Sequence, residues 1–295
     1  MLQRLEWTVI RRLDGLLQGD YRTLFRGQGL DLLDVRPYEP GDDVRYIDWN
    51  VTARMDEIYV RQYLEDREIS GWFLLDLSPS IDFGTTQSRK RDQLLSFVAV
   101  LSRLLTRHGN RVGVIAYGDR VEAPIPPSTG RRQVLRLIHE LDRRAPLASA
   151  PFTALGELLA AAAKTIRRRS LVFIVSDFIS APGWETPLAM LARRHEIVAV
   201  RLVDPREMEL PDIGGVYFND AETGEQLFVD THDERFRRRF IEAAKAREKA
   251  LSETFARHGI AVLPLSTDDD LVSAVIRFAA ARKRGRAAAH AAAGR

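Results

Sequence analysis

The sequence predicts an α/β fold, with a doubly wound, mostly parallel sheet of about six strands and helices on both faces. One observation is the alternation, from residue 71 onward, of short apolar runs with segments of helical periodicity, which is typical of βαβ units. Another is that each run is nearly continuous in apolar residues, as in strands that are covered on both faces. The runs span residues 71–77, 111–118, 171–177, 196–204 and 259–266.

Helices and one edge strand are predicted between these runs. The helix after the first run stops at Gly109, because glycine favours the backbone conformation just past a helix end. Residues 119–127 are predicted to form an antiparallel edge strand, since their prolines are tolerated only at the edge of a sheet. We expect further helices over about 233–257 and after a cap formed by Thr267 and Asp270.

The first 70 residues have a different pattern. They contain a predicted amphipathic helix that ends at Gly19, then a Gly-, Pro- and Asp-rich segment, and a strand with period-2 alternation over 58–65. The first core strand is flanked on both sides in a doubly wound sheet, so we expect 58–65 to join a hairpin at 214–230 in a small β subdomain. The predicted parts are therefore residues 1–70, a core domain at 71–280 containing the inserted hairpin, and a disordered basic tail at 281–295.

Composition indicates a soluble, cytoplasmic protein. The 295 residues are 45% hydrophobic and 29% charged, and no window approaches the roughly 18 apolar residues of a membrane span. The absence of cysteine suits a reducing compartment and excludes thiolate ligands and cysteine nucleophiles. The 44 basic and 41 acidic residues nearly balance, and the resulting formal charge of +3 does not by itself indicate nucleic-acid binding.

Oxygen-bearing side chains follow two of the predicted strands directly. Asp76 lies at the end of the first run, with Ser78 and Ser80 at two-residue spacing, and Asp177 ends the third run. Ligands of open α/β sheets bind at the carboxyl ends of strands where the strand order reverses, so both carboxylates meet if these strands are neighbours. Two carboxylates with hydroxyls make the all-oxygen ligand set that Mg²⁺ takes. The alternative is a capped turn before the next helix.

The D-x-S-x-S signature that begins at Asp76 resembles that of the von Willebrand factor A-like fold, whose metal-ion-dependent adhesion site adds a distant threonine and a second aspartate. By this resemblance Asp177 is the second aspartate and Thr153 is the best threonine, although Ser128 and Thr129 offer hydroxyls in another loop. The resemblance implies a site for Mg²⁺, or another divalent cation, made of Asp76, Ser78, Ser80, Thr153 and Asp177.

Residues 35–63, "VRPYEPGDDVRYIDWNVTARMDEIYVRQY", resemble the hallmark block of the bacterial family called domain of unknown function fifty-eight, which is linked to MoxR-type AAA+ ATPases. The resemblance implies a non-enzymatic protein–protein interaction module that binds an acidic side chain of its partner through the metal. It also implies a MoxR-type ATPase as partner, in the assembly or maturation of protein complexes. Within the block, Asp48, Trp49 and Arg54 are candidates for partner contact, or for a buried pin that holds the segment in place.

Two other functions stay open from the sequence. Mg²⁺-assisted hydrolysis could use Asp76 and Asp177 with Asp82 as base, and residues 89–91 place three basic side chains at the start of the next helix. No nucleophile or phosphate-binding motif accompanies them. Nucleic-acid binding would depend on the tail sequence "ARKRGR", a charge run that is more often simply solvated.

Overall fold

A computed structural model describes residues 35–39, 42, 44, 47–55, 57–61, 70–85, 88–145, 147, 153–219 and 225–293. These residues belong to two compact units. The N-terminal unit lies within Arg26–Glu68, and the sheet unit contains the described residues from 70 onward. The amphipathic helix predicted before Gly19 lies outside the described residues.

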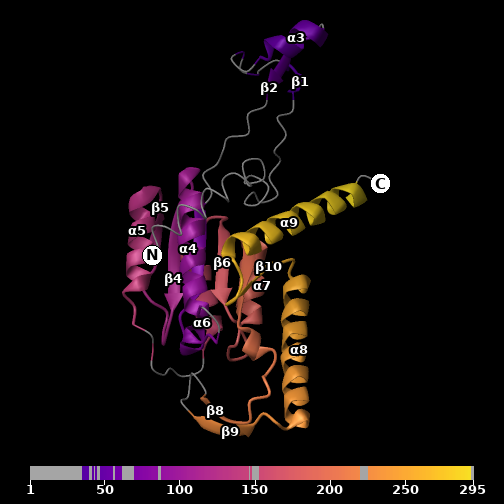
Figure 1. Cartoon of the computed structure of the whole chain (residues 1–295). Helices are drawn as coiled ribbons and strands as arrows, with labels where there is room; N and C mark the ends of the chain where they lie inside the picture. The colour runs from indigo at the N-terminus through magenta and orange to yellow at the C-terminus, as the bar shows by residue number, and fades with distance from the viewer. Residues whose placement is uncertain are drawn as a thin grey trace. The chain divides into compact units, whose positions relative to one another are not determined.

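A six-stranded sheet forms the centre of the sheet unit (Figure 1). The strand order is β10-β7-β6-β3-β4-β5, and all neighbours are parallel except β5, which is antiparallel to β4. This sheet confirms the predicted fold class, and β5 lies at the edge that its prolines predicted. The strands are β3 (Ser70–Asp76), β4 (Arg111–Tyr117), β5 (Ile125–Ser128), β6 (Leu171–Ser176), β7 (Glu196–Val203) and β10 (Ala261–Ser266).

Helices cover both faces of the sheet, and each face has its own apolar cluster (Figure 1). On one face, strand side chains pack with buried residues of α4 (Lys90–Arg107), α5 (Gly130–Asp142) and α9 (Leu271–Ala293). The other face packs against α6 (Leu155–Thr165), α7 (Glu185–Arg194) and α8 (Glu234–Arg257). Among the helices in the described ranges, none is both long and apolar enough to cross a membrane.

Strand β3 lies between β4 and β6, and this position determines where the candidate site forms. Leu75 pairs with Val175 of β6, and Asp76 pairs with Tyr117 of β4. After β5 the chain returns to the opposite side of β3, so the strand order reverses between β3 and β6. The strands that lead to Asp76 and Asp177 are therefore neighbours at the switch point, which is the condition under which both carboxylates meet.

The small β elements differ from the prediction. In the N-terminal unit, β1 (Val35–Pro37) pairs with β2 (Tyr59–Arg61), and in the sheet unit β8 (Gly215–Asn219) pairs with β9 (Gln226–Asp230). The two elements at 58–65 and 214–230 therefore do not pair with each other, because each strand finds an antiparallel partner close to it in sequence. Residues 62–65 of the predicted strand lie outside the described part of the chain.

At the C-terminal end the structure has a helix where the sequence predicted a tail. Residues 281–293, expected to be disordered, continue α9 up to Ala293. Alanine and arginine, which make up most of this segment, have the highest intrinsic helix propensities, so an existing helix extends through them without an apolar stripe.

The aromatic contacts between α4 and the sheet should contribute strongly to stability. Phe97 packs edge-to-face on Phe73 and Phe173, with ring centroids 6.3 Å and 5.7 Å away. Phe97→Ala should lower the free energy of unfolding by about 3–5 kcal/mol, because it removes a fully buried ring and leaves a cavity. Leu135→Ala, at an exposed position of α5, should change it by less than about 0.5 kcal/mol. Chemical denaturation measures both, and equal effects would contradict this assignment of the core.

Candidate metal centre

Asp76 ends β3 and is fully buried. Its Oδ1 accepts a hydrogen bond from the backbone N–H of Ser78 at 3.0 Å, and its Oδ2 accepts one from Ser176 Oγ at 2.7 Å. Burial and the nearby charge of Asp177 raise the pKa of Asp76 to about 6, although these hydrogen bonds favour the ionised form. The carboxylate is therefore a group that a nearby cation would stabilise.

The two serines of the signature lie side by side. Ser78 precedes the 3₁₀ helix η2 (Pro79–Asp82), and Ser80 belongs to it. Their Oγ atoms are 3.1 Å apart. Adjacent ligands of an octahedral Mg²⁺ ion, each about 2.1 Å from the metal, lie about 3.0 Å apart. The spacing of the two hydroxyls thus matches two neighbouring positions of such an ion.

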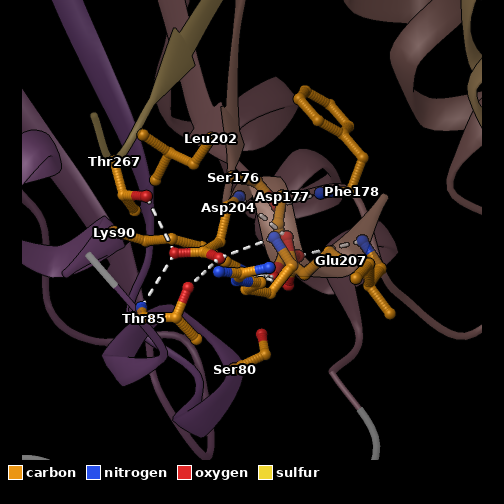
Figure 2. Close-up of polar contacts among 12 residues, drawn as sticks. Ser80, Thr85, Lys90, Ser176, Asp177, Phe178, Leu202, Asp204, Glu207 and Thr267 are labelled. Atoms are coloured by element: carbon orange, nitrogen blue, oxygen red, sulfur yellow. Dashed lines mark hydrogen bonds and ion pairs between the residues drawn. The ribbon is translucent and has the colours of Figure 1, made fainter. Parts of the chain in front are cut away.

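Asp177 follows β6 and is also fully buried. Its Oδ1 accepts from the backbone N–H of Ile179 at 3.0 Å, and its Oδ2 accepts from Lys90 Nζ at 2.8 Å (Figure 2). The next residue, Phe178, has a φ of 55°, a left-handed conformation that is unfavourable for a residue with a side chain. Its ring is buried against Phe255, at a centroid distance of 5.0 Å, and this packing holds the turn directly after Asp177.

Thr153 lies against the loop that follows Asp177. It is buried, and its carbonyl oxygen accepts from Ser180 Oγ at 2.8 Å and from the backbone N–H of Ala181 at 2.9 Å. The alternative hydroxyls lie elsewhere: Ser128 pairs with Val112 near the start of β4, whereas Asp76 pairs with Tyr117 at its end. Of the threonine candidates, the structure brings only Thr153 to the carboxyl edge of the sheet.

The sequence placed Lys90 only among three basic residues at the start of the next helix, and did not identify it as a partner of Asp177. Lys90 is the first residue of α4 and is completely buried, and its Nζ donates to Asp177 Oδ2 and to Glu207 Oε1. Burial alone would lower the pKa of Lys90, but the charges of Asp177 and Glu207 outweigh it and the pKa is raised. The same ammonium outweighs burial at Asp177 and lowers the pKa of that carboxyl. Because Lys90 lies between two arginines in the sequence, it looks like a solvated residue.

Asp204 is a third buried aspartate at the same edge, directly after β7. Its carboxylate accepts four hydrogen bonds: from the N–H and hydroxyl of Thr85, from the hydroxyl of Thr267 and from the N–H of Arg206, at 2.9, 2.6, 2.8 and 2.9 Å (Figure 2). These bonds join the loop before α4 to the ends of β7 and β10. The position of Asp204 at a strand end was the signal that could have identified it from sequence.

The donor set fits Mg²⁺. The described residues contain no group of three His, Cys, Asp or Glu side chains that could hold a metal ion, so the candidate ligands are two carboxylates supplemented by hydroxyls. All are hard oxygen donors, two of the hydroxyls have the spacing of neighbouring ligands, and the two carboxylates balance a divalent charge. One of these carboxylates, Asp177, already has a cationic partner in Lys90.

The candidate partner-binding residues lie in the N-terminal unit. Asp48 is buried, and its Oδ1 accepts from the backbone N–H of Val51 at 3.3 Å, so it supports the start of helix α3 (Trp49–Met55). The side chain of Trp49 is 68% exposed, and Arg54 is exposed in the last turn of the same helix. Trp49 and Arg54 are therefore exposed on the surface of the N-terminal unit, whereas Asp48 is buried and stabilises the start of the helix.

The doubly wound sheet, with a serine–aspartate cluster where the strand order reverses, defines a von Willebrand factor A-like domain. The chain belongs to the family described as "Protein of unknown function DUF58", which matches residues 34–250. An uncharacterized protein of Mycobacterium tuberculosis is 38% identical over 292 residues, 98% of this chain and 91% of that protein. An uncharacterized protein of Mycobacterium avium is 36% identical over 164 residues, 55% of this chain and 95% of that protein.

Solved structures with a similar arrangement have low sequence identity. The conserved hypothetical protein BatB from Bacteroides thetaiotaomicron is 15% identical, with a TM-score of 0.48 over 73% of this chain and 99% of that chain. The SpRpn10 VWA domain is 14% identical, with a TM-score of 0.37 over 70% of this chain and 92% of that chain. At sequence identities this low, the similarity concerns the fold and not the function.

Asp204→Asn should destabilise the protein by about 2–4 kcal/mol, because an amide cannot accept all four hydrogen bonds. Burial would raise the pKa of Asp204, but its donors lower it, so its contribution to stability is present above the usual carboxyl pKa and is lost as the pH falls through the lower folded value. Urea denaturation from pH 3 to 7 should show this acid-dependent loss in wild type and a smaller one in the variant. Asp119→Asn, at an exposed turn, is the control; matching profiles for both variants would refute the assignment.

Proposed function

We propose that this protein is a Mg²⁺-dependent, non-enzymatic protein–protein interaction module. The observation that carries the proposal is the meeting of two fully buried carboxylates, Asp76 and Asp177, beside a pair of serine hydroxyls 3.1 Å apart. Such an oxygen cluster is suited to a hard divalent cation, and loops at the carboxyl edge of an α/β sheet are open to a partner.

Each residue of the cluster has a distinct part. Asp76 and Asp177 would supply the negative charge, and Ser78 and Ser80 would supply neutral ligands. Thr153, whose backbone carbonyl is held by Ser180, would add a further hydroxyl. When bound, Mg²⁺ supplies a coordination position for a carboxylate oxygen of the partner. Ser176 holds Asp76 in place through its hydroxyl, so the ligands are oriented before a partner arrives.

We propose a MoxR-type AAA+ ATPase as the partner, in the assembly or maturation of other protein complexes in the cytoplasm. Membership of the DUF58 family supports this choice, because the resemblance of residues 35–63 to the hallmark block of that family implies a link to such ATPases. An Asp or Glu side chain of the ATPase would complete the metal coordination. The exposed side of α3, with Trp49, would add a second contact.

The enzymatic alternative has less support. A hydrolase acting at Asp76 and Asp177 would need cations to hold a phosphate, but the ammonium of Lys90 is completely buried between Asp177 and Glu207. The guanidinium of Arg91 lies 3.6 Å from Asp82, the candidate base. Nucleic-acid binding would depend on the basic residues near the end of α9, and no other observation points to it.

Removing a candidate ligand should abolish metal binding. Isothermal titration of the full chain with MgCl₂ should give saturable binding to wild type and none to Asp76→Ala, because that variant loses half of the carboxylate charge of the site. Asp82→Ala, which removes a carboxylate of the same loop outside the ligand set, should retain binding within about tenfold. In a pull-down, wild type should capture a MoxR-type ATPase, and this capture should be lost when chelator is added or when Asp76→Ala replaces wild type. Capture that persists both with chelator and with Asp76→Ala would contradict the proposed metal-mediated contact.

The exposed tryptophan of α3 should contribute to partner affinity and not to metal affinity. Trp49→Ala should weaken binding of the ATPase about 30-fold, as expected for an aromatic anchor, with Mg²⁺ affinity unchanged. Met55→Ala, at a 57% exposed position of the same helix, is the matched control and should have a smaller effect. Surface plasmon resonance on the three proteins measures this, and equal affinities would remove Trp49 from the interface.

A further inference from the structure

We propose that Lys90 is a built-in counter-cation that competes with Mg²⁺ for Asp177, so that metal binding requires the ammonium to move fully onto Glu207. This inference rests on the proposed function, because it takes the same oxygen cluster as the metal site. It adds that a side chain of the protein itself, Lys90, lowers the metal affinity of that cluster. In the absence of metal, the lysine would keep Asp177 paired, and the remaining negative charge of the site would repel a partner's carboxylate.

The position of Lys90 is unusual for a lysine. Its side chain is completely buried, and its Nζ lies 2.8 Å from Asp177 Oδ2, at a carboxylate that belongs to the candidate ligand set (Figure 2). Its backbone N–H donates to the carbonyl of Phe83 at 3.0 Å, which ties the start of α4 to the loop that follows the two serines. A buried ammonium is stable only when paired, so Lys90 stays with its carboxylates and not in solvent.

Glu207 gives the ammonium a second position. Its Oε1 accepts from Lys90 Nζ, and its Oε2 accepts from the backbone N–H of Asp204 at 3.1 Å. The 3₁₀ helix η3 (Pro205–Glu207), capped by Asp204, fixes this carboxylate beside the site. Lys90 can therefore give up Asp177 without becoming an unpaired buried charge, which would be far more costly than exchanging one carboxylate for another.

The charge balance favours a divalent cation. Asp76, Asp177 and Glu207 carry three formal negative charges and Lys90 carries one positive charge, so two negative charges are left for a cation to neutralise. Asp204, at the same edge, is satisfied by its own four hydrogen-bond donors and lies outside this count. Arg201, whose charge also acts on Asp177, pairs with Glu248 and adds no net charge. With the ammonium on Asp177, however, an incoming Mg²⁺ is repelled and lacks one of its carboxylates. The lysine therefore lowers affinity without changing the ligands.

The test is a calorimetric titration of the full chain with MgCl₂ in four forms: wild type, Lys90→Met, Lys249→Met and Glu207→Gln. Lys90→Met keeps the length of the side chain and removes its charge, so Mg²⁺ should bind about tenfold more tightly, or better. Lys249→Met removes a lysine that is 79% exposed and should leave the affinity unchanged. Glu207→Gln removes the second position of the ammonium and should weaken Mg²⁺ binding severalfold.

A second readout covers the case in which Lys90→Met folds poorly without metal. Thermal melts with and without MgCl₂ should show a larger upward shift for this variant than for wild type, because a ligand that binds the native state more tightly stabilises it more. Circular dichroism checks that each form is folded at the start of the titration. A Mg²⁺-induced shift no larger than that of wild type would count against the proposal.

The outcomes separate this inference from the proposed function. If wild type binds Mg²⁺, Asp76→Ala does not, and Lys90→Met binds no more tightly than wild type, the competition is overturned while the metal site stands. If none of the forms binds Mg²⁺, both proposals are overturned. Tighter binding by Lys90→Met together with weaker binding by Glu207→Gln supports the lysine as the competitor.

Discussion

The burial of three aspartates at one edge of the sheet is the constraint on which the loops of this protein depend. Asp76, Asp177 and Asp204 are fully buried, and an ionised carboxylate is costly to bury unless donors or a cation meet it. Each carboxylate therefore orders the chain around it. Hydroxyls and backbone N–H groups satisfy Asp76 and Asp204, and an ammonium is needed at Asp177.

The donors come from segments that are distant in sequence, so the same bonds that satisfy the carboxylates also connect the ends of the strands. Asp204 links the loop before α4 with the ends of β7 and β10, through Thr85 and Thr267. It also caps the short helix that presents Glu207 to Lys90. Asp204 is not a candidate ligand, but through Glu207 it helps to position the Lys90 ammonium beside the ligand Asp177. The residues that hold the loops together are therefore connected to the residues of the candidate site.

In the proposed metal site, the electrostatic arrangement would hold the candidate ligands ready and still limit their affinity for a cation. Serine hydroxyls at the spacing of octahedral neighbours preorganise the site, whereas a fully buried lysine opposes a second cation beside it. A weak metal site of the proposed kind would suit reversible association, because a partner's carboxylate would then contribute a large part of the binding free energy of the metal.

The sequence alone determined the sheet, the order of its elements and the aspartates and serines of the candidate site, because continuous apolar runs and side chains placed at strand ends are local signals. It also identified the family segment. Only the tertiary structure decided that Thr153 and not Ser128 lies at the carboxyl edge, that the small β strands pair within their own segments, and that Lys90 is buried between Asp177 and Glu207. The positions of Thr153 and Lys90 depend on contacts between residues far apart in the chain, and the pairing of the small strands depends on which nearby segment each strand meets; local composition specifies neither.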